Sequence, residues 1–336
     1  MKRLLPLPII CLCSFQFALA NPNSAEQAIF GNQSKYNQAQ PKQQQEHISI
    51  ESTELKRLFH SVIDDNNVVA ADTIKQAANS GNRNASLYYG YLANTGKLPN
   101  KGTDFALAMK AYRKASRQKN KQGQEIGFYG NHLATYNIGL MYLNGHGVPK
   151  NPTEAYRWFK ICNETYKEKN YGDSFFPALV HMARMLQTGL GVPKDDKQAV
   201  EFWRLASEKS SEAKVAYAKM AIAGQGMPVT MTVAVNKLEE AANQWNQEAI
   251  LTLIKIYGKG DGLTRKANKV AVAKWYLILS AANKKYKGKA NSALSELKPE
   301  QQNEARKEAN IFLSGHSRLP DTFDYNKPLY QNPKKH

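Results

Sequence analysis

The chain has 336 residues, with 46 Lys and Arg against 28 Asp and Glu and a formal net charge of +18. An excess of positive charge predicts an acidic partner or surface, but the sequence contains no nucleic-acid-binding motif. Because that motif is missing, nucleic acid is not the expected partner. The positive charge then favours an acidic protein, an envelope polymer or anionic lipid headgroups reached by peripheral contact.

Residues 1–20 have the features of a secretory signal peptide. Two basic residues precede an apolar run at 4–17, and the segment ends with Ala-Leu-Ala, a small-x-small pattern. The apolar run is too short to span a membrane. We expect cleavage after Ala20 and export to the periplasm, with full secretion as the alternative. Cleavage leaves Cys162 as the one remaining cysteine, so no internal disulfide is expected.

Residues 21–48 are rich in Gln, Asn, Ser and Pro and contain few apolar residues. This composition predicts a disordered linker, with a Gln-rich binding arm as the alternative. Residues 49–84 carry two short helical patterns, the second ending with the small pair Ala77 and Ala78. We expect these helices to form the N-terminal cap of a helical stack.

A pattern of small residues recurs about five times between residues 85 and 289. Eleven residues after the first alanine of each copy the sequence has glycine in all five, and four copies have a second glycine two residues later. Glycine supplies the positive φ that ends a helix and turns the chain. The pattern therefore predicts helix–turn–helix units. The first alanines are Ala85, Ala134, Ala178, Ala213 and Ala249, and the shared glycines are Gly96, Gly145, Gly189, Gly224 and Gly260.

The second helix of each unit has its own pattern. An alanine opens it, and a second small residue follows seven positions later, as at Ala155 and Cys162. Seven residues are two helical turns, so both lie on one face. Insertions at about 121–130 and 163–174 are predicted to be edge loops, where solenoids often contact partners.

The C-terminal part continues with a polar, amphipathic segment at 290–313, in which Pro299 stands near a helix start. This segment predicts a C-terminal capping helix. Residues 314–336 contain three prolines and no helical period. They predict a tail that is flexible or lies over the last repeat.

The second and third copies resemble the Sel1-like repeat family, relatives of the tetratricopeptide repeats. The resemblance covers about residues 85–313. It implies an all-α, right-handed α/α superhelical solenoid of helix-turn-helix Sel1-like repeats, with the first helices lining a concave groove. The second copy matches at Ala134, Gly139, Tyr142, Gly145, Gly147, Val148, Ala155 and Trp158, and the third at Ala178, Gly189, Gly191, Val192, Asp195, Ala199 and Trp203.

Candidate binding residues occupy the variable positions of the first helices. Positions three and six residues after each first alanine share one helix face, which the resemblance places in the groove. That face is more aromatic in the first copies and basic in the last three, where it would form a basic ladder. The alternative is an ordinary solvated surface. The predicted partner-binding residues are Tyr88, Tyr91, Asn137, Leu140, His181, Arg184, Lys219 and Lys255.

The sequence shows no catalytic constellation. Its glycines belong to turns rather than to a phosphate loop, and its seven histidines are scattered without metal-ligand spacing. The acidic pairs at 64–65 and 195–196 fit helix ends. We expect no enzyme activity, no cofactor and no metal.

Three functions remain open. The first is a periplasmic scaffold or adaptor that binds a protein partner, expected to be acidic, through its partly basic groove. The second, suggested by exported members of the resembling family, is an immunity protein that neutralises a phospholipase effector of type VI secretion. The third is a beta-lactamase-like hydrolase, ascribed to cysteine-rich relatives. It is disfavoured because this chain lacks their cysteines and a serine-lysine motif.

We predict that the protein recovered from cells begins at Asn21, because signal peptidase cleaves after a small-x-small pattern. N-terminal sequencing or intact mass of protein from the periplasmic fraction measures this. A chain that retains Met1 and sediments with membranes would contradict the cleavage and the location together.

Overall fold

The structure is a computed structural model. The residues that it describes are 50–119, 125–128, 130–169, 171–172, 174–260, 266–316 and 324–331. They belong to the second of the two units into which the chain divides, His47–His336. The predicted signal peptide (1–20) and all but the last two residues of the predicted linker precede this unit, and both segments lie outside the described residues.

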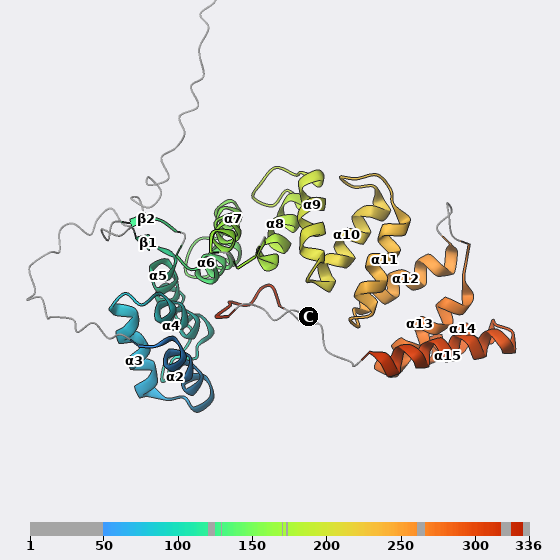
Figure 1. The fold of residues 1–336 in the computed structure, drawn as a ribbon, viewed down its shortest axis with the longest axis horizontal. Helices are drawn as coiled ribbons and strands as arrows, with labels where there is room; N and C mark the ends of the chain where they lie inside the picture. Colours follow the sequence, from blue (N-terminus) through green and yellow to red (C-terminus); the bar gives the residue numbers. More distant parts are fainter. Residues whose placement is uncertain are drawn as a thin grey trace, which may run out of the picture. The chain divides into compact units, whose positions relative to one another are not determined.

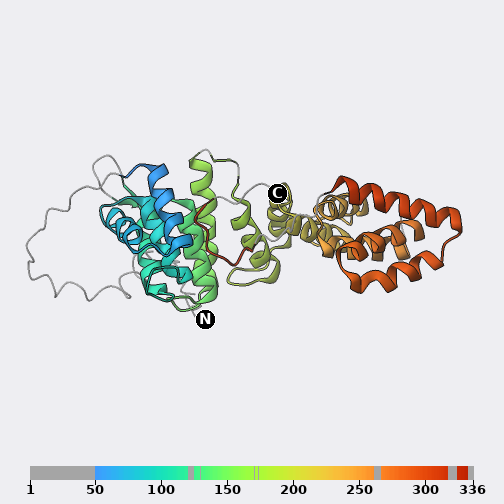
Figure 2. The ribbon, with the colours of Figure 1, turned by 90° about the horizontal axis from the view of Figure 1, so that it is seen from below.

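The second unit is built from consecutive helices, each of which packs mainly on the helices before and after it (Figures 1 and 2). This neighbour-to-neighbour packing is characteristic of a solenoid, and the predicted all-α solenoid of helix–turn–helix units is confirmed. The helices are α2 (Ser52–Asp65), α3 (Val68–Asn79), α4 (Arg83–Thr95), α5 (Phe105–Ser116), α6 (His132–Asn144), α7 (Pro152–Glu168), α8 (Phe176–Thr188), α9 (Asp196–Ser207), α10 (Ser211–Ala223), α11 (Met231–Ala242), α12 (Gln247–Lys259), α13 (Lys269–Ala282), the 3-10 helix η2 (Lys284–Tyr286), α14 (Lys287–Ser295) and α15 (Pro299–Gly315).

The five sequence copies fall on the pairs α4–α5, α6–α7, α8–α9, α10–α11 and α12–α13. The first alanine of a copy stands near the start of its first helix, and in four copies its amide donates to the side chain of the N-cap residue. The acceptors are Asn82, Asn131, Ser210 and Asn246. Because a cap satisfies an amide that has no partner inside the helix, the alanine column also marks where each repeat begins.

The shared glycine ends the first helix in the left-handed conformation in four copies. Gly145, for example, has φ 77° and ψ 31°, and its amide donates to the carbonyl of Met141. Gly260 differs, with φ 73° and ψ 177°. The helix α12 therefore ends without the left-handed cap that the other four copies share.

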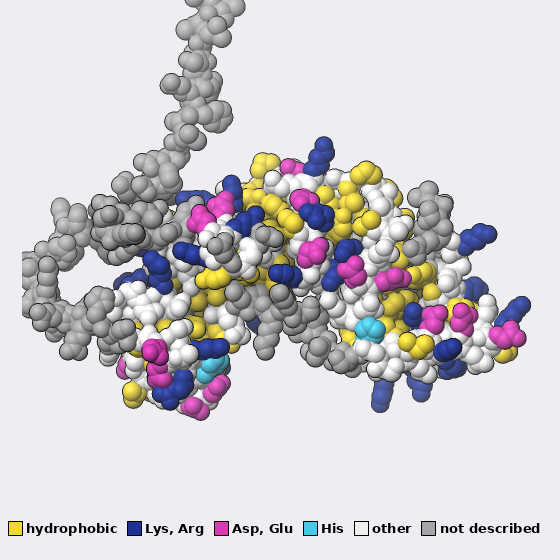
Figure 3. All heavy atoms as spheres, in the orientation of Figure 1, with side chains coloured by type: hydrophobic (Ala, Val, Ile, Leu, Met, Phe, Trp, Pro, Cys, Tyr) yellow, Lys and Arg dark blue, Asp and Glu magenta, His cyan; other side chains and the backbone are white. Residues whose placement is uncertain are grey.

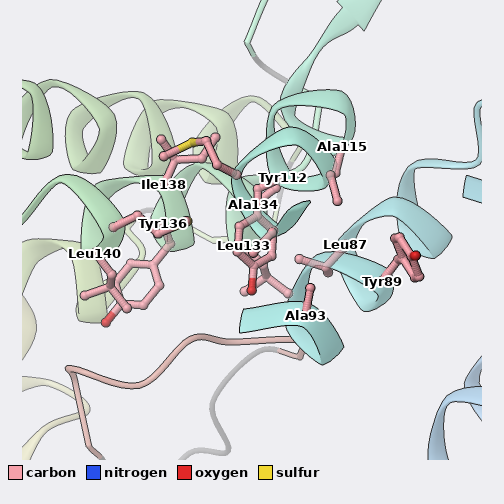
Figure 4. Packing of buried hydrophobic residues seen from close by; sticks show 14 of the residues in the cluster. Leu87, Tyr89, Ala93, Tyr112, Ala115, Leu133, Ala134, Tyr136, Ile138 and Leu140 are labelled. Atoms are coloured by element: carbon pink, nitrogen blue, oxygen red, sulfur yellow. The ribbon is translucent and has the colours of Figure 1, made fainter. Parts of the chain in front are cut away.

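Small residues inside the first helix make room for the second helix. A Cβ added at Gly139 would lie 2.7 Å from the ring of Phe159, and one added at Gly90 would lie 2.8 Å from the ring of Tyr112. Figure 4 shows the resulting core at the first two repeats, where buried side chains of α4, α5 and α6 meet in one cluster.

The second glycine of each turn makes the contact between repeats. A Cβ at Gly191 would lie 2.5 Å from the carbonyl carbon of Pro152, at the start of the preceding repeat's second helix. Gly147 and Gly226 meet the backbone of Phe105 and Asp196 in the same way. Each repeat therefore stands on the previous one through main-chain contact that a side chain would prevent.

Three segments differ from their predicted form. The helix α7 continues into the predicted insertion at 163–174, where the Asn163 side chain accepts a hydrogen bond of 2.8 Å from the amide of Phe175. Part of the insertion at 121–130 pairs as a short antiparallel hairpin, β1 (Gln118–Lys119) with β2 (Glu125–Gly127). The predicted cap at 290–313 is two helices, α14 and α15, of which α15 packs on α13.

Two further properties concern the described residues as a whole. None of their helices has both the length and the apolar character needed to cross a membrane. Cys162 is fully buried in the column that holds alanine in the next two repeats. This column is the one in which the sequence has a small residue seven positions after the opening alanine of the second helix.

Replacing Gly191 by Ala should destabilise the protein more than replacing Gly189 by Ala. Both residues have a positive φ, 76° and 73°, which costs a non-glycine residue about 1 kcal/mol. At Gly189 the nearest atom to an added Cβ is 3.6 Å away, so the backbone cost stands alone. At Gly191 overpacking adds about 1–3 kcal/mol. Urea unfolding of the two variants measures the difference in unfolding free energy. Equal losses of unfolding free energy would contradict a close contact between repeats at the second glycine.

Candidate functional site

The C-terminal residues 324–331, called the tail segment from here on, lie against the first helices of the early repeats. In both ribbon views this dark red segment runs beside α6 and α8 (Figures 1 and 2). The tail was predicted to be flexible or to lie over the last repeat. Its residues 324–331 instead contact residues of α2, α4, α6 and α8 and the residue before α10.

Tyr325 is the most deeply buried residue of the tail segment, with 5% of its surface exposed. Its carbonyl oxygen accepts a hydrogen bond of 2.8 Å from the Tyr136 hydroxyl and lies 2.8 Å from Nε2 of His181. Its own hydroxyl is hydrogen-bonded to the Ser210 hydroxyl. Ser210 also caps α10, accepting from the amide of Ala213 at 3.1 Å. One tyrosine thus joins the second, third and fourth repeats.

Leu329 is held through its main chain by one asparagine. The Asn137 side chain donates to the Leu329 carbonyl and accepts from the Leu329 amide, each at 2.7 Å. Asn137 is fully buried, so both of its hydrogen-bonding groups need partners. The peptide group of the tail provides them regardless of the side chain at that position.

Tyr330 inserts among aromatic rings of the cap and the first repeat. Its ring centroid lies 4.8 Å from that of Phe59 and 4.8 Å from that of Tyr91. The ring of Tyr88 stacks on the ring of Phe59, with the two centroids 4.4 Å apart. Aromatic pairs in these ranges stabilise a contact beyond simple burial. We call the surface formed by Phe59, Tyr91, Tyr136, Asn137, His181 and Ser210 the tail-binding face.

His181 is neutral in this environment. Burial lowers the pKa of His181 to about 4, and the nearby Arg184 guanidinium adds to the lowering while the Tyr325 carbonyl opposes it. A carbonyl oxygen only accepts hydrogen bonds, so Nε2 carries the imidazole hydrogen in the contact with Tyr325. The ring stacks on Phe159 at 4.6 Å. His181 therefore acts as a neutral hydrogen-bond donor to the Tyr325 carbonyl, and its ring is held in place by packing on Phe159.

The predicted basic ladder is interleaved with acidic residues. Arg184 of α8 forms an ion pair with Glu212 of α10, and Lys219 of α10 forms one with Glu248 of α12. Lys255 is exposed on α12. Figure 3 shows acidic and basic side chains interspersed over the visible face. Exposed pairs of this kind contribute between 0 and about 1 kcal/mol, so they connect neighbouring repeats weakly and reduce the positive charge at two of the three positions.

The structure brings together part of the predicted partner-binding set. Tyr91, Asn137 and His181 contact the tail segment, and Tyr88 supports the ring cluster. Leu140 is buried with 3% exposed and belongs to the hydrophobic core. The three basic residues of the set lie on the first helices of the last three repeats, Arg184 on α8, Lys219 on α10 and Lys255 on α12.

Sequence reasoning missed the other residues of this site. Tyr136 stands one position before Asn137 and so lies off the predicted binding face, and Ser210 has the sequence context of an ordinary helix cap. Phe59 belongs to the capping helix α2. A signal for the tail existed, because Tyr325, Leu329 and Tyr330 are large apolar residues in a polar, proline-containing stretch.

The described residues contain no group of three or more His, Cys, Asp and Glu side chains placed to hold a metal ion. Burial raises the pKa of the Cys162 thiol, which keeps it protonated and unreactive at neutral pH.

Comparison with known proteins identifies the class. The Sel1 repeat family model matches residues 132–161 and 177–211, which are the second and third helix pairs. A solved structure of a Sel1 repeat protein from Oxalobacter formigenes is 21% identical and has a TM-score of 0.55, covering 78% of this chain and 99% of that one. The structure of c5321, a protective antigen with an SLR fold from uropathogenic Escherichia coli, is 17% identical with a TM-score of 0.44, covering 79% of this chain and 61% of that one. No curated protein matches the chain.

The fold is thus that of an α-helical repeat solenoid. Two of its helix pairs match the Sel1 repeat family model, and its fold is similar to that of a solved Sel1 repeat protein. Sel1 repeat solenoids in general are scaffolds for protein–protein interaction and are typically not catalytic.

Acidification should destabilise the protein partly through His181. The folded pKa of about 4 lies below the ordinary value of about 6.5. Between these values the unfolded chain binds more protons, so stability falls as pH falls. A single group of this kind accounts for about 2–3 kcal/mol between pH 7.5 and 4.5.

The variant His181→Gln keeps a donor for the Tyr325 carbonyl but does not titrate. Its unfolding free energy, measured in urea at both pH values, should fall by less than that of the wild type. Identical losses in the two proteins would contradict a buried, neutral His181.

Proposed function

We propose that this protein is an exported scaffold or adaptor that binds a protein partner through the tail-binding face. The observation that carries the proposal is that this face already holds a non-helical peptide segment. It does so through hydrogen bonds from side chains of two repeats to the peptide main chain. Side chains placed to bond a peptide group suit a polypeptide better than a lipid surface or a sugar polymer.

Location and partner charge belong to the same proposal. Periplasmic export rests on the signal-peptide features of residues 1–20. Without Lys2 and Arg3 the chain keeps 44 basic and 28 acidic residues, a formal charge of +16. This charge favours an acidic partner by long-range attraction. The ion pairs of Arg184 and Lys219 assign these two residues to the junctions between repeats, so the attraction is spread over the surface.

The proposal is tested by recovering partners from cell-envelope extract with the mature chain, tagged at its N-terminus. Asn137→Ala removes both hydrogen bonds to a bound main chain. Asn144→Ala is the matched control, because Asn144 lies on the same helix α6 and is exposed. A partner bound through the face should be lost, by at least about tenfold in affinity, with the first variant and kept with the second.

The identity of the recovered protein then separates the functions. A lipase-like protein would specify an immunity function against a phospholipase effector, and an envelope or secretion component would specify the scaffold. Thermal unfolding of both variants controls for loss of the fold. A partner that binds Asn137→Ala as tightly as the wild type would contradict binding through this face.

A further inference from the structure

The tail segment has the properties of a ligand bound to the solenoid. It forms no helix and pairs with no strand, and its contacts are made to side chains of helices that belong to different repeats. Asn137 and His181 are buried polar residues, and both are hydrogen-bonded to the main chain of the tail segment. Buried polar groups require partners, so this face is suited to being covered by a peptide.

Three side chains of the segment give the contact a pattern. The Tyr325 ring meets Phe176 edge to face at 6.5 Å, and its hydroxyl meets Ser210. Leu329 and Tyr330 pack on the core formed with the cap and first repeats. The recognised pattern is therefore a tyrosine followed, after three residues, by an aliphatic residue and a second tyrosine.

The segment also carries its own turn. The Asp324 side chain accepts from the amide of Asn326 at 3.0 Å, and the Asp324 carbonyl accepts from the amide of Lys327 at 3.1 Å. Pro328 then fixes one backbone angle. A turn formed locally reduces the entropy lost on binding.

We propose, building on the function proposed above, that the tail-binding face is a recognition site for peptides of the pattern Tyr-x3-Leu-Tyr, and that the chain's own tail is its resident competitor. A partner carries a segment of this pattern and binds by displacing the tail. The conformational entropy lost by ordering eight residues opposes the stabilisation from a small number of hydrogen bonds. The docked tail therefore exchanges with an undocked state. Tethering nevertheless gives the tail an effective concentration on the order of mM.

The competition can be measured with a fluorescein-labelled synthetic peptide of residues 324–331, Asp-Tyr-Asn-Lys-Pro-Leu-Tyr-Gln, by anisotropy. The mature full-length chain with Tyr325→Ala, Leu329→Ala and Tyr330→Ala together has lost the anchors of its tail. It should bind the peptide at least about tenfold more tightly than the wild type, because no tethered competitor remains.

Four further measurements make the result specific. Asn326→Ala with Gln331→Ala changes two exposed residues of the same segment and should leave the wild-type affinity unchanged. Adding Asn137→Ala to the triple variant should weaken peptide binding by at least about tenfold. A peptide with both tyrosines and the leucine replaced by alanine should not bind. The single variant Tyr330→Ala, a milder change, should give an affinity between those of the wild type and the triple variant.

Several results would overturn the inference. The peptide could fail to bind the folded triple variant, or it could bind the wild type and the triple variant with equal affinity. It could also bind the triple variant with unchanged affinity after Asn137→Ala is added. A wild-type dimer in size-exclusion chromatography that dissociates in the triple variant would show that the tail docks on a second copy, and would overturn its role as an internal competitor. If envelope partners still depend on Asn137 while the peptide does not bind, the recognition pattern is wrong and the proposed function stands. If the peptide binds but no partner depends on Asn137, the proposed function fails instead.

Discussion

The close approach of main chain to main chain at the second turn glycine governs how the repeats stack. At Gly147, Gly191 and Gly226 the backbone lies against the start of the preceding repeat's second helix, where a Cβ has no room. The same residues have positive φ values between 70° and 76°, so they also turn the chain toward its next helix. Glycine meets both requirements at once. Because the contact is made by backbone atoms, the distance between neighbouring repeats does not depend on the side chains that each repeat carries.

Regular stacking aligns one face of every first helix. Side chains from α6 and α8 and the cap of α10 thereby reach a single eight-residue segment, although they belong to three repeats. The burial of Asn137 and His181 would be unfavourable on an empty apolar surface. It is compatible with stability because the main chain of Tyr325 and Leu329 supplies the missing hydrogen bonds. The face and its peptide are therefore complementary parts of one structure.

The same alignment pairs charges along the later repeats. Arg184 and Glu212, and likewise Lys219 and Glu248, stand on successive first helices. Each cation is near the first turn of the next helix, where an acidic residue is also favoured by the helix dipole. The high net charge of the chain thus coexists with local pairing, and it acts on association over long range more than through a continuous basic stripe.

The sequence by itself determined the features that depend on local geometry. Glycine spacing located the turns because positive φ is a property of the residue, and the alanine columns located the helix pairs because only small residues permit close packing. Helical spacing also placed Tyr91, Asn137 and His181 on one face. The tertiary structure decided what depends on distant partners. Asn137 and Leu329 are 192 residues apart in the chain, and no local pattern encodes their meeting. The burial of Leu140 and the pairing of Arg184 with Glu212 depend on the rotation between neighbouring repeats, which is fixed only when their backbones are in contact.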